Sequence, residues 1–128
     1  MKRASILTFA ILFVMSNIFA QKTGTFTDSR DGETYKTIKI ENQTWMSENL
    51  SYAYDKGCWT YDDNSENLNK YGYLYDWETS NKVCPNGWYL PSVEEFVKML
   101  DLYGGVKSES AYNALLPDGA SGFSALLG

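Results

Sequence analysis

A complete helix signal at residues 84–105, CPNGWYLPSVEEFVKMLDLYGG, constrains the fold of this chain more than any other stretch. Ser92 and Glu95 have the spacing of a capping box, in which the serine hydroxyl accepts a backbone N–H and the glutamate reaches back to the serine amide. Beyond this cap, apolar residues recur at three- and four-residue spacing, at Phe96, Met99, Leu100 and Tyr103. Gly104 and Gly105 then end the pattern. The sequence therefore predicts an amphipathic helix that begins after Ser92 and packs one apolar face on the rest of the domain.

The first 20 residues form a typical secretory signal pattern, so they are set aside before the fold is considered. Lys2 and Arg3 precede a short apolar run, and Ala20 offers a small residue for cleavage. An uncleaved anchor is the alternative, but a membrane span needs about 20 apolar residues and this run is shorter. We therefore expect a signal peptide at 1–20 and one domain at 21–128. The expected location is outside the cell, secreted or on the cell surface, with no stable membrane span after cleavage.

The charge balance argues against nucleic acid and anionic membranes as partners. The chain has 11 basic and 16 acidic residues, and losing Lys2 and Arg3 with the signal raises the acidic excess from five to seven. Such a surface is repelled by phosphate. The chain also has no histidine, the residue that acid–base and cysteine-nucleophile catalysis use most often. We therefore expect no enzyme activity and no cofactor, although a pair of carboxylates acting on glycosides is an alternative that the sequence leaves open.

Cys58 and Cys84 are the only cysteines. In an exported chain an even number favours a disulfide, and closing this loop of about 25 residues contributes about 3 to 4 kcal/mol in the chain-entropy model. A metal pair or two reactive thiols is the alternative, but a zinc site needs further cysteines or histidines. The sequence therefore predicts a disulfide between Cys58 and Cys84.

The remaining chain predicts short strands and exposed loops. Residues 33–46 are typical of a hairpin, because β-branched and aromatic residues alternate before a polar turn and a second short run. Aromatic residues at every second position of 71–77 fit an edge strand and a short helix start equally well. Polar stretches predict loops at 22–31, 55–70 and 106–112, the last with Ser108 as a possible helix cap. The expected fold class is α+β, with a small antiparallel sheet, one or two helices and long irregular loops.

Tryptophan residues are the candidate ligand contacts. All four Trp and all ten Tyr lie after residue 20, and such residues either fill a core or stack on sugar rings. The tryptophans that we expect to be largely buried are Trp45, Trp77 and Trp88. We expect Trp59 to be the most exposed, and Trp59, Asp62 and Asp63 form the candidate ligand-binding site. Acidic clusters at 28–33 and 62–66 offer calcium as an alternative ligand, but neither has the spacing of a calcium loop, and we predict no metal site.

Three ordered motifs resemble one protein family. They are FTDSRDGETYKTIKIENQTWMSENLSYAY at 26–54, YGYLYDW at 71–77 and CPNGWYLPSVEEF at 84–96. In this order they are similar to the opening signatures of the Fibrobacter succinogenes major paralogous domain, and the resemblance covers about residues 24–127. It implies an exported bacterial domain with no established enzymatic activity.

One short stretch is also similar to a second group of proteins, and the chain differs from the family pattern at two places. The run GWYLPSVEEF is also similar to the sulfatase-modifying-factor group of C-type-lectin-like folds, which implies helices on a small twisted antiparallel sheet. The catalytic cysteines of that group have no counterpart here. Family members often have a cysteine about where Leu68 stands, which offers a different partner for Cys58 and leaves it unpaired in this chain. GFSALLG at 122–128 resembles a motif after which members continue, so we expect a truncated member with an incomplete sheet.

These observations favour an exported, non-enzymatic surface or secreted module that binds polysaccharide or another cell-envelope component. The first alternative is a structural or interaction domain with no small ligand, whose aromatic residues are all in the core. The second is a non-functional truncated paralogue that does not fold stably, and a broad thermal melt would support it.

Overall fold

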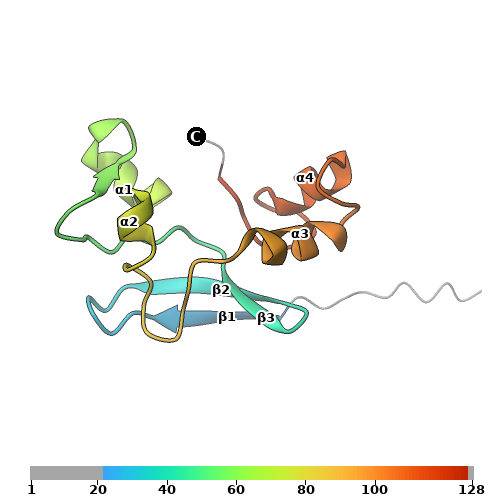
Figure 1. Ribbon diagram of the computed structural model, residues 1–128, viewed down its shortest axis with the longest axis horizontal. Helices are drawn as coiled ribbons and strands as arrows, with labels where there is room; N and C mark the ends of the chain where they lie inside the picture. Colours follow the sequence, from blue (N-terminus) through green and yellow to red (C-terminus); the bar gives the residue numbers. More distant parts are fainter. Residues whose placement is uncertain (1–21, 127–128) are drawn as a thin grey trace, which may run out of the picture.

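A three-stranded antiparallel sheet forms the base of the domain (Figure 1). In this computed structural model, which describes residues 22–126, the strand order is β1 (Lys22–Thr27), β2 (Thr34–Ile40) and β3 (Gln43–Met46). The predicted hairpin is confirmed, because β2 and β3 pair with Ile38 opposite Trp45. The predicted signal peptide lies outside the described residues. Within residues 22–126, no helix is long and apolar enough to cross a membrane.

Strand β1 corrects the prediction of a loop at 22–31. All six of its residues pair with β2, from Lys22 opposite Lys39 to Thr27 opposite Thr34. Five of the six residues are exposed and only Phe26 is half-buried. The sequence of the strand therefore lacks the alternation of apolar and polar residues that predicts a strand. Backbone pairing with β2 therefore holds β1 in place, with Phe26 packed on the Trp88 ring at 5.0 Å between centroids.

Residues 58–80 form a second unit, which we call the small lobe. A two-stranded antiparallel ribbon of β4 (Cys58–Thr60) and β5 (Tyr73–Tyr75) encloses two 3₁₀ turns and α1 (Leu68–Tyr71), and α2 (Trp77–Ser80) follows. The loop predicted at 55–70 is therefore wrong in part. The two alternatives at 71–77 are both present, a strand followed by a helix start. Gly72 makes this turn at φ 65°, where a Cβ atom would lie 2.5 Å from the Leu50 carbonyl oxygen.

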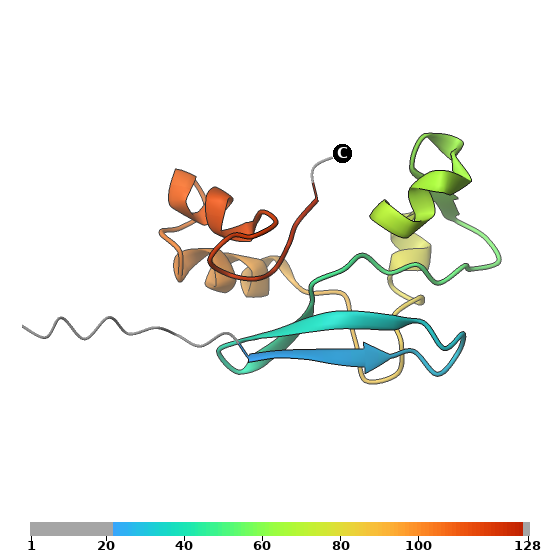
Figure 2. The same cartoon turned by 180° about the vertical axis from the view of Figure 1, so that it is seen from behind.

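Two helices near the C-terminus also lie above the sheet, on the opposite side from the small lobe (Figure 2). The capping box of α3 (Val93–Asp101) is confirmed: the Ser92 hydroxyl accepts from the Glu95 amide at 3.2 Å, and the Glu95 carboxylate accepts from the Ser92 amide at 2.8 Å. The sequence prediction missed the length of α4 (Glu109–Leu115), which begins within the loop predicted at 106–112. Its possible cap is confirmed, because the Ser108 hydroxyl accepts from the Ala111 amide at 3.0 Å. Its buried residues are Ala111 and Ala114, which are too small to make a visible apolar stripe.

The hydrophobic core lies between the sheet and α3. Ile38, Ile40, Trp45 and Met99 are its buried residues, with Phe96, Leu115 and Phe123 packed against them. The Trp45 ring meets the Phe96 and Phe123 rings at 5.3 and 5.7 Å between centroids. The domain is thus α+β, with small antiparallel sheets and short helices, as the sequence predicts.

A partly buried ion pair joins the β1–β2 turn to the segments on either side of the small lobe. Asp28, with 1% of its surface exposed, accepts from Arg30 Nη2 at 2.6 Å and from Nε at 2.9 Å. The same guanidinium donates through Nη1 to the Val83 carbonyl at 2.8 Å and lies 3.8 Å from the centre of the Tyr52 ring. We call these four residues the Arg30 cluster. It ties the β1–β2 turn to the segments that precede and follow the small lobe.

Replacing Asp28 with Asn should lower the free energy of unfolding by about 2 to 3 kcal/mol, because it removes the charge that faces a partly buried guanidinium. Hydrogen bonds from Arg30 hold the pKa of Asp28 below its ordinary value of 3.8. This stabilisation is therefore present above about pH 4 and is lost as the pH falls through the folded-state pKa. Urea unfolding between pH 2 and 7 measures both effects.

Asp31→Asn is the matched control, because the exposed Asp31 side chain accepts from the Glu33 amide at 3.0 Å, which an asparagine also does, and its charge acts on Arg30 much less than that of Asp28. Equal stability of Asp28→Asn and Asp31→Asn, or an unchanged acid dependence in Asp28→Asn, would contradict the role of this ion pair.

Replacing Ser92 with Ala should cost about 1 kcal/mol, because it removes the acceptor for the Glu95 amide at the start of α3. Ser92→Asp, which retains an acceptor at the cap, should keep most of the stability. Thermal melts of the two variants compare them directly, and an unchanged melting temperature in Ser92→Ala would show that the cap contributes nothing.

Candidate functional site

The candidate ligand residue Trp59 lies on the exposed face of the small lobe's ribbon. Trp59 on β4 stands directly opposite Leu74 on β5, and 51% and 49% of their surfaces are exposed. Their strand neighbours Cys58, Thr60, Tyr73 and Tyr75 are all half-buried. The pair, which we call the Trp59 face, is thus an aromatic ring beside an aliphatic side chain on a regular strand pair.

On its other side, the ribbon is held by hydrogen bonds to residues 50–52 of the same chain. The Tyr75 hydroxyl donates to the Tyr52 carbonyl at 2.7 Å, and burial raises the pKa of the Tyr75 phenol. The Tyr73 amide donates to the Leu50 carbonyl at 3.0 Å, and the ribbon itself is extended by one pair because the Asp76 amide donates to the Gly57 carbonyl at 3.0 Å. The Trp59 face is therefore presented by a fixed backbone.

The predicted burial of the tryptophans is right for Trp45 and wrong for Trp77. Trp45 is buried in the core and Trp88 is half-buried, whereas 76% of Trp77 is exposed, more than of Trp59. Trp77 is the first residue of a four-residue helix, and the buried residue of that helix is Thr79, whose hydroxyl donates to the Lys56 carbonyl at 3.0 Å. One short turn can bury only one side, so Trp77 faces solvent.

Asp62 and Asp63 follow Trp59 closely in the 3₁₀ turn Tyr61–Asp63 and are exposed. Both have left-handed backbone conformations, with φ of 54° and 51°. The neighbouring Tyr61 ring packs on the Tyr71 ring at 5.0 Å between centroids. Within residues 22–126, no group of three or more acidic, histidine or cysteine side chains lies close enough to hold a metal ion.

The predicted disulfide is wrong, because Cys58 and Cys84 are both free in the structure. The Cys58 thiol donates to the Tyr54 carbonyl at 3.1 Å and accepts from the Tyr54 amide at 3.3 Å. The Cys84 thiol donates to the Ser80 carbonyl at 3.8 Å. Each cysteine thus contacts the chain four residues before it. An even number of cysteines therefore does not show that the fold brings them together.

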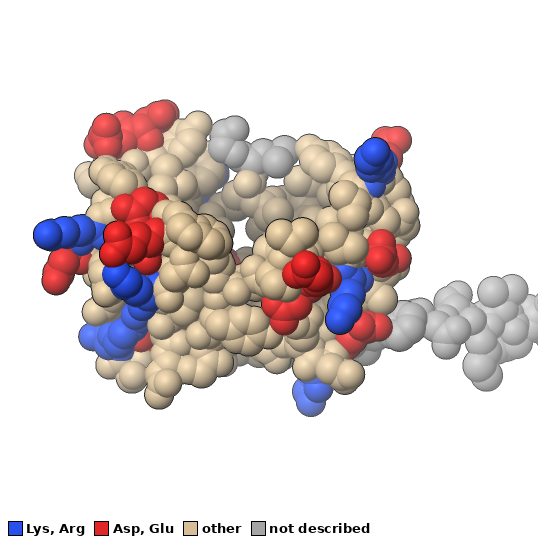
Figure 3. Space-filling view, in the orientation of Figure 1, with Lys and Arg blue, Asp and Glu red and all other residues tan. Residues whose placement is uncertain are grey.

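Sequence reasoning missed a polar cleft between the small lobe and the C-terminal segment. A cavity of about 560 Å³ lies above β2, and a second of about 530 Å³ lies beside it over β1. Lys36, Ser47 and Ser124 line both cavities, so we treat the two as one central cleft. Figure 3 shows the hollow between the two sides of the molecule, with acidic and basic side chains around it.

The floor of the central cleft belongs to the same sheet face as the hydrophobic core. Thr23 lies opposite Ile38 and Thr25 opposite Lys36, and side chains opposite each other in a sheet share a face. Helix α3 and Phe123 cover the apolar part of this face. The part under the cleft is mixed, because the hydroxyl groups of Thr23 and Thr25 lie there beside apolar surface that includes Ile38.

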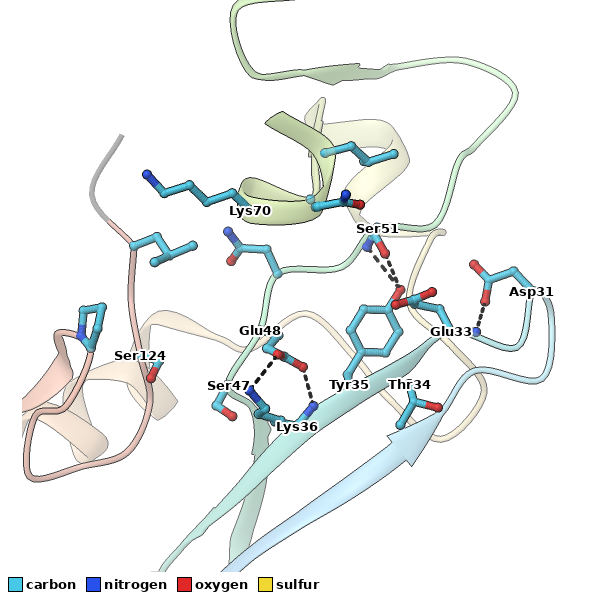
Figure 4. Close-up of a pocket in the computed structure, with 16 residues that line it drawn as sticks. Asp31, Glu33, Thr34, Tyr35, Lys36, Ser47, Glu48, Ser51, Lys70 and Ser124 are labelled. Carbon is cyan, nitrogen blue, oxygen red and sulfur yellow. Dashed lines mark hydrogen bonds and ion pairs between the residues drawn. The ribbon is translucent and has the colours of Figure 1, made fainter. Parts of the chain in front are cut away.

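Side chains from four segments, 31–36, 47–51, 68–72 and 117–126, form the walls of the central cleft (Figure 4). Lys36 and Glu48 form an ion pair at 3.4 Å, and the Tyr35 hydroxyl shares a hydrogen bond with Ser51 at 3.0 Å. Ser124 lies on the C-terminal segment, and Ser47 lies between it and Tyr35 in Figure 4. None of the sequence-predicted ligand residues, Trp59, Asp62 and Asp63, lines either cavity. The two candidate surfaces are therefore separate.

The fold and these surfaces define a small α+β domain with an exposed aromatic face and a polar cleft. The family model of the Fibrobacter succinogenes major domain matches residues 38–122, most of the chain. The chain belongs to this family, as its three motifs predict. No curated protein matches the chain, and no solved structure does, so the C-type-lectin-like relationship stays a prediction.

Both cysteines should react with iodoacetamide without prior reduction, and Cys58 should react faster than Cys84. Burial raises the pKa of the Cys84 thiol, which lowers its thiolate fraction at pH 8, and the thiolate is the form that reacts. Intact mass and peptide mapping over a time course measure both rates. A mass that rises only after reduction would contradict two free thiols, because it would mean that the cysteines are bonded.

Proposed function

We propose that this protein is an exported, non-enzymatic surface or secreted module that binds polysaccharide or another envelope component through the Trp59 face. The observation that carries the proposal is the exposed Trp59 ring beside Leu74 on a ribbon. Aromatic rings are the usual stacking partners of sugar rings. The signal pattern of residues 1–20 supports export.

The geometry of the small lobe suits a surface that binds an extended ligand. A ring on a strand with a fixed backbone loses little conformational freedom when a ligand stacks on it. The carboxylates of Asp62 and Asp63 follow in the adjoining turn, where they are exposed and free to accept hydrogen bonds from sugar hydroxyls. Trp59, Asp62 and Asp63 are therefore the residues that we assign to this site.

Hydrogen bonds keep several carboxyl groups outside the Trp59 face ionised, which makes these groups poor general acids. Glycoside hydrolysis needs a carboxyl group whose pKa is raised, so that it is protonated when it donates to the leaving group. Within residues 22–126, every carboxyl group with a shifted pKa has it lowered. A hydrogen bond from the Thr79 amide lowers the pKa of Asp76, one from the Ser92 amide lowers that of Glu95, and the bond from Arg30 lowers that of Asp28. These groups stay ionised and act as acceptors.

An interaction domain without a small ligand is the second candidate, and one observation favours it. Tyr89, Leu90 and Val93 are all exposed at the start of α3. Three large apolar side chains so close in sequence are more typical of a protein contact than of a solvated turn. This candidate predicts that binding to glycan is absent, whereas the Trp59 face predicts that it is present.

Trp59→Ala should reduce retention on insoluble glycans by about fivefold to thirtyfold, which corresponds to about 1 to 2 kcal/mol for one lost stacking contact. The measurement is depletion of residues 21–128 from solution by a panel of insoluble cell-wall polysaccharides. Tyr112→Ala is the matched control, because Tyr112 on α4 is also 51% exposed but lies outside the small lobe.

Thermal melts establish that both variants fold. Equal retention of Trp59→Ala and wild type on every glycan that binds, or no retention on any glycan, would refute the assignment.

A further inference from the structure

We propose that the central cleft is a second binding site, for a neutral oligosaccharide of several units, and that it acts independently of the Trp59 face. The two cavities of about 560 and 530 Å³ share three lining residues. Together they form a trough that runs across β1 and β2. A ligand that fills it is elongated and touches polar groups on more than one side.

Several polar side chains of the central cleft are not used by the fold. The side chains of Ser47, Asn69 and Ser124 form no hydrogen bond to any residue between 22 and 126. Asn49 uses its amide nitrogen to donate to the Tyr71 carbonyl at 2.9 Å, which leaves its carbonyl oxygen available. Hydroxyl and amide groups both donate and accept, so this set matches the hydroxyl groups of a sugar chain.

Ser124 occupies a backbone conformation that a serine rarely adopts. Its φ is 60°, which costs a non-glycine residue on the order of 1 kcal/mol. The residues on both sides hold it there: Phe123 packs on Trp45, and the Ala125 amide donates to the Leu115 carbonyl at 2.7 Å. The fold thus maintains a strained serine whose hydroxyl has no partner among residues 22–126, at a position that lines both cavities. Strain of this kind is concentrated at functional sites.

The charges and the floor select the ligand class. The ion pair of Lys36 with Glu48 neutralises one charge of each sign within the cleft, and the other charged lining residues are Asp31, Glu33 and Lys70. Because both signs are present in similar number, the cleft favours neither a strongly acidic nor a strongly basic ligand. The floor combines the hydroxyl groups of Thr23 and Thr25 with apolar surface that includes Ile38, and a sugar ring likewise presents both hydroxyl groups and apolar C–H groups.

The test is a titration of ¹⁵N-labelled protein with soluble neutral hexasaccharides, namely cellohexaose, xylohexaose, mannohexaose and chitohexaose. At least one should shift the amide signals of the cleft, and the fitted Kd should weaken by about threefold to tenfold in Ser124→Gly and in Asn69→Ala, since each variant removes one hydrogen-bonding side chain. Ser124→Gly separates binding from folding, because glycine adopts φ near 60° without strain and should raise the melting temperature. Asn113→Ala, on the exposed side of α4, is the matched control and should leave the Kd unchanged.

The test distinguishes this site from the Trp59 face. Trp59→Ala should leave the hexasaccharide Kd unchanged, even if it abolishes retention on insoluble glycan. The proposal is overturned if no hexasaccharide shifts the cleft signals, if the Kd depends on Trp59 and not on Ser124, or if a mixed hexapeptide pool shifts these signals where the sugars do not.

Discussion

The buried carboxylate of Asp28 is the constraint on which the arrangement of the domain depends. A charge with 1% of its surface exposed must be paired, and Arg30, two residues away, provides the pair. In this position Arg30 also bonds the Val83 carbonyl and stacks on Tyr52. Tyr52 precedes the small lobe and Val83 follows it. A local ion pair in one turn therefore determines where the chain enters and leaves a separate part of the fold.

This arrangement produces two surfaces of different chemistry. The ribbon of the small lobe is held by its inner hydrogen bonds, so its outer side can expose Trp59 and Leu74 without being needed for the core. Beside the lobe, the sheet face changes from the apolar residues under α3 to the hydroxyl groups under the central cleft. The apolar part stabilises the fold, and the polar part leaves groups that the fold does not use.

Local signals in the sequence predicted part of this fold. The capping box of Ser92 and Glu95 located α3, because both hydrogen bonds are made within four residues. Strand β1 was missed because backbone pairing with β2 holds it, and its residues show no alternation of apolar and polar side chains. Helix α4 was missed because its buried residues are small alanines, which do not form a recognisable apolar stripe. The exposure of Trp77 depends on which side of a single turn is buried. The two free cysteines and the central cleft depend on distances between remote segments, which spacing along one chain does not contain.

Amide hydrogen exchange of Arg30→Lys tests most directly whether the Arg30 cluster positions the small lobe. A lysine can still pair with Asp28, but it cannot also reach the Val83 carbonyl and stack on Tyr52 with a planar group. We expect amides of β4, β5 and α2 to lose protection in this variant, while those of β2, β3 and α3 keep it. Unchanged protection in the small lobe, or an equal loss throughout the domain, would show that the Arg30 cluster does not position the small lobe.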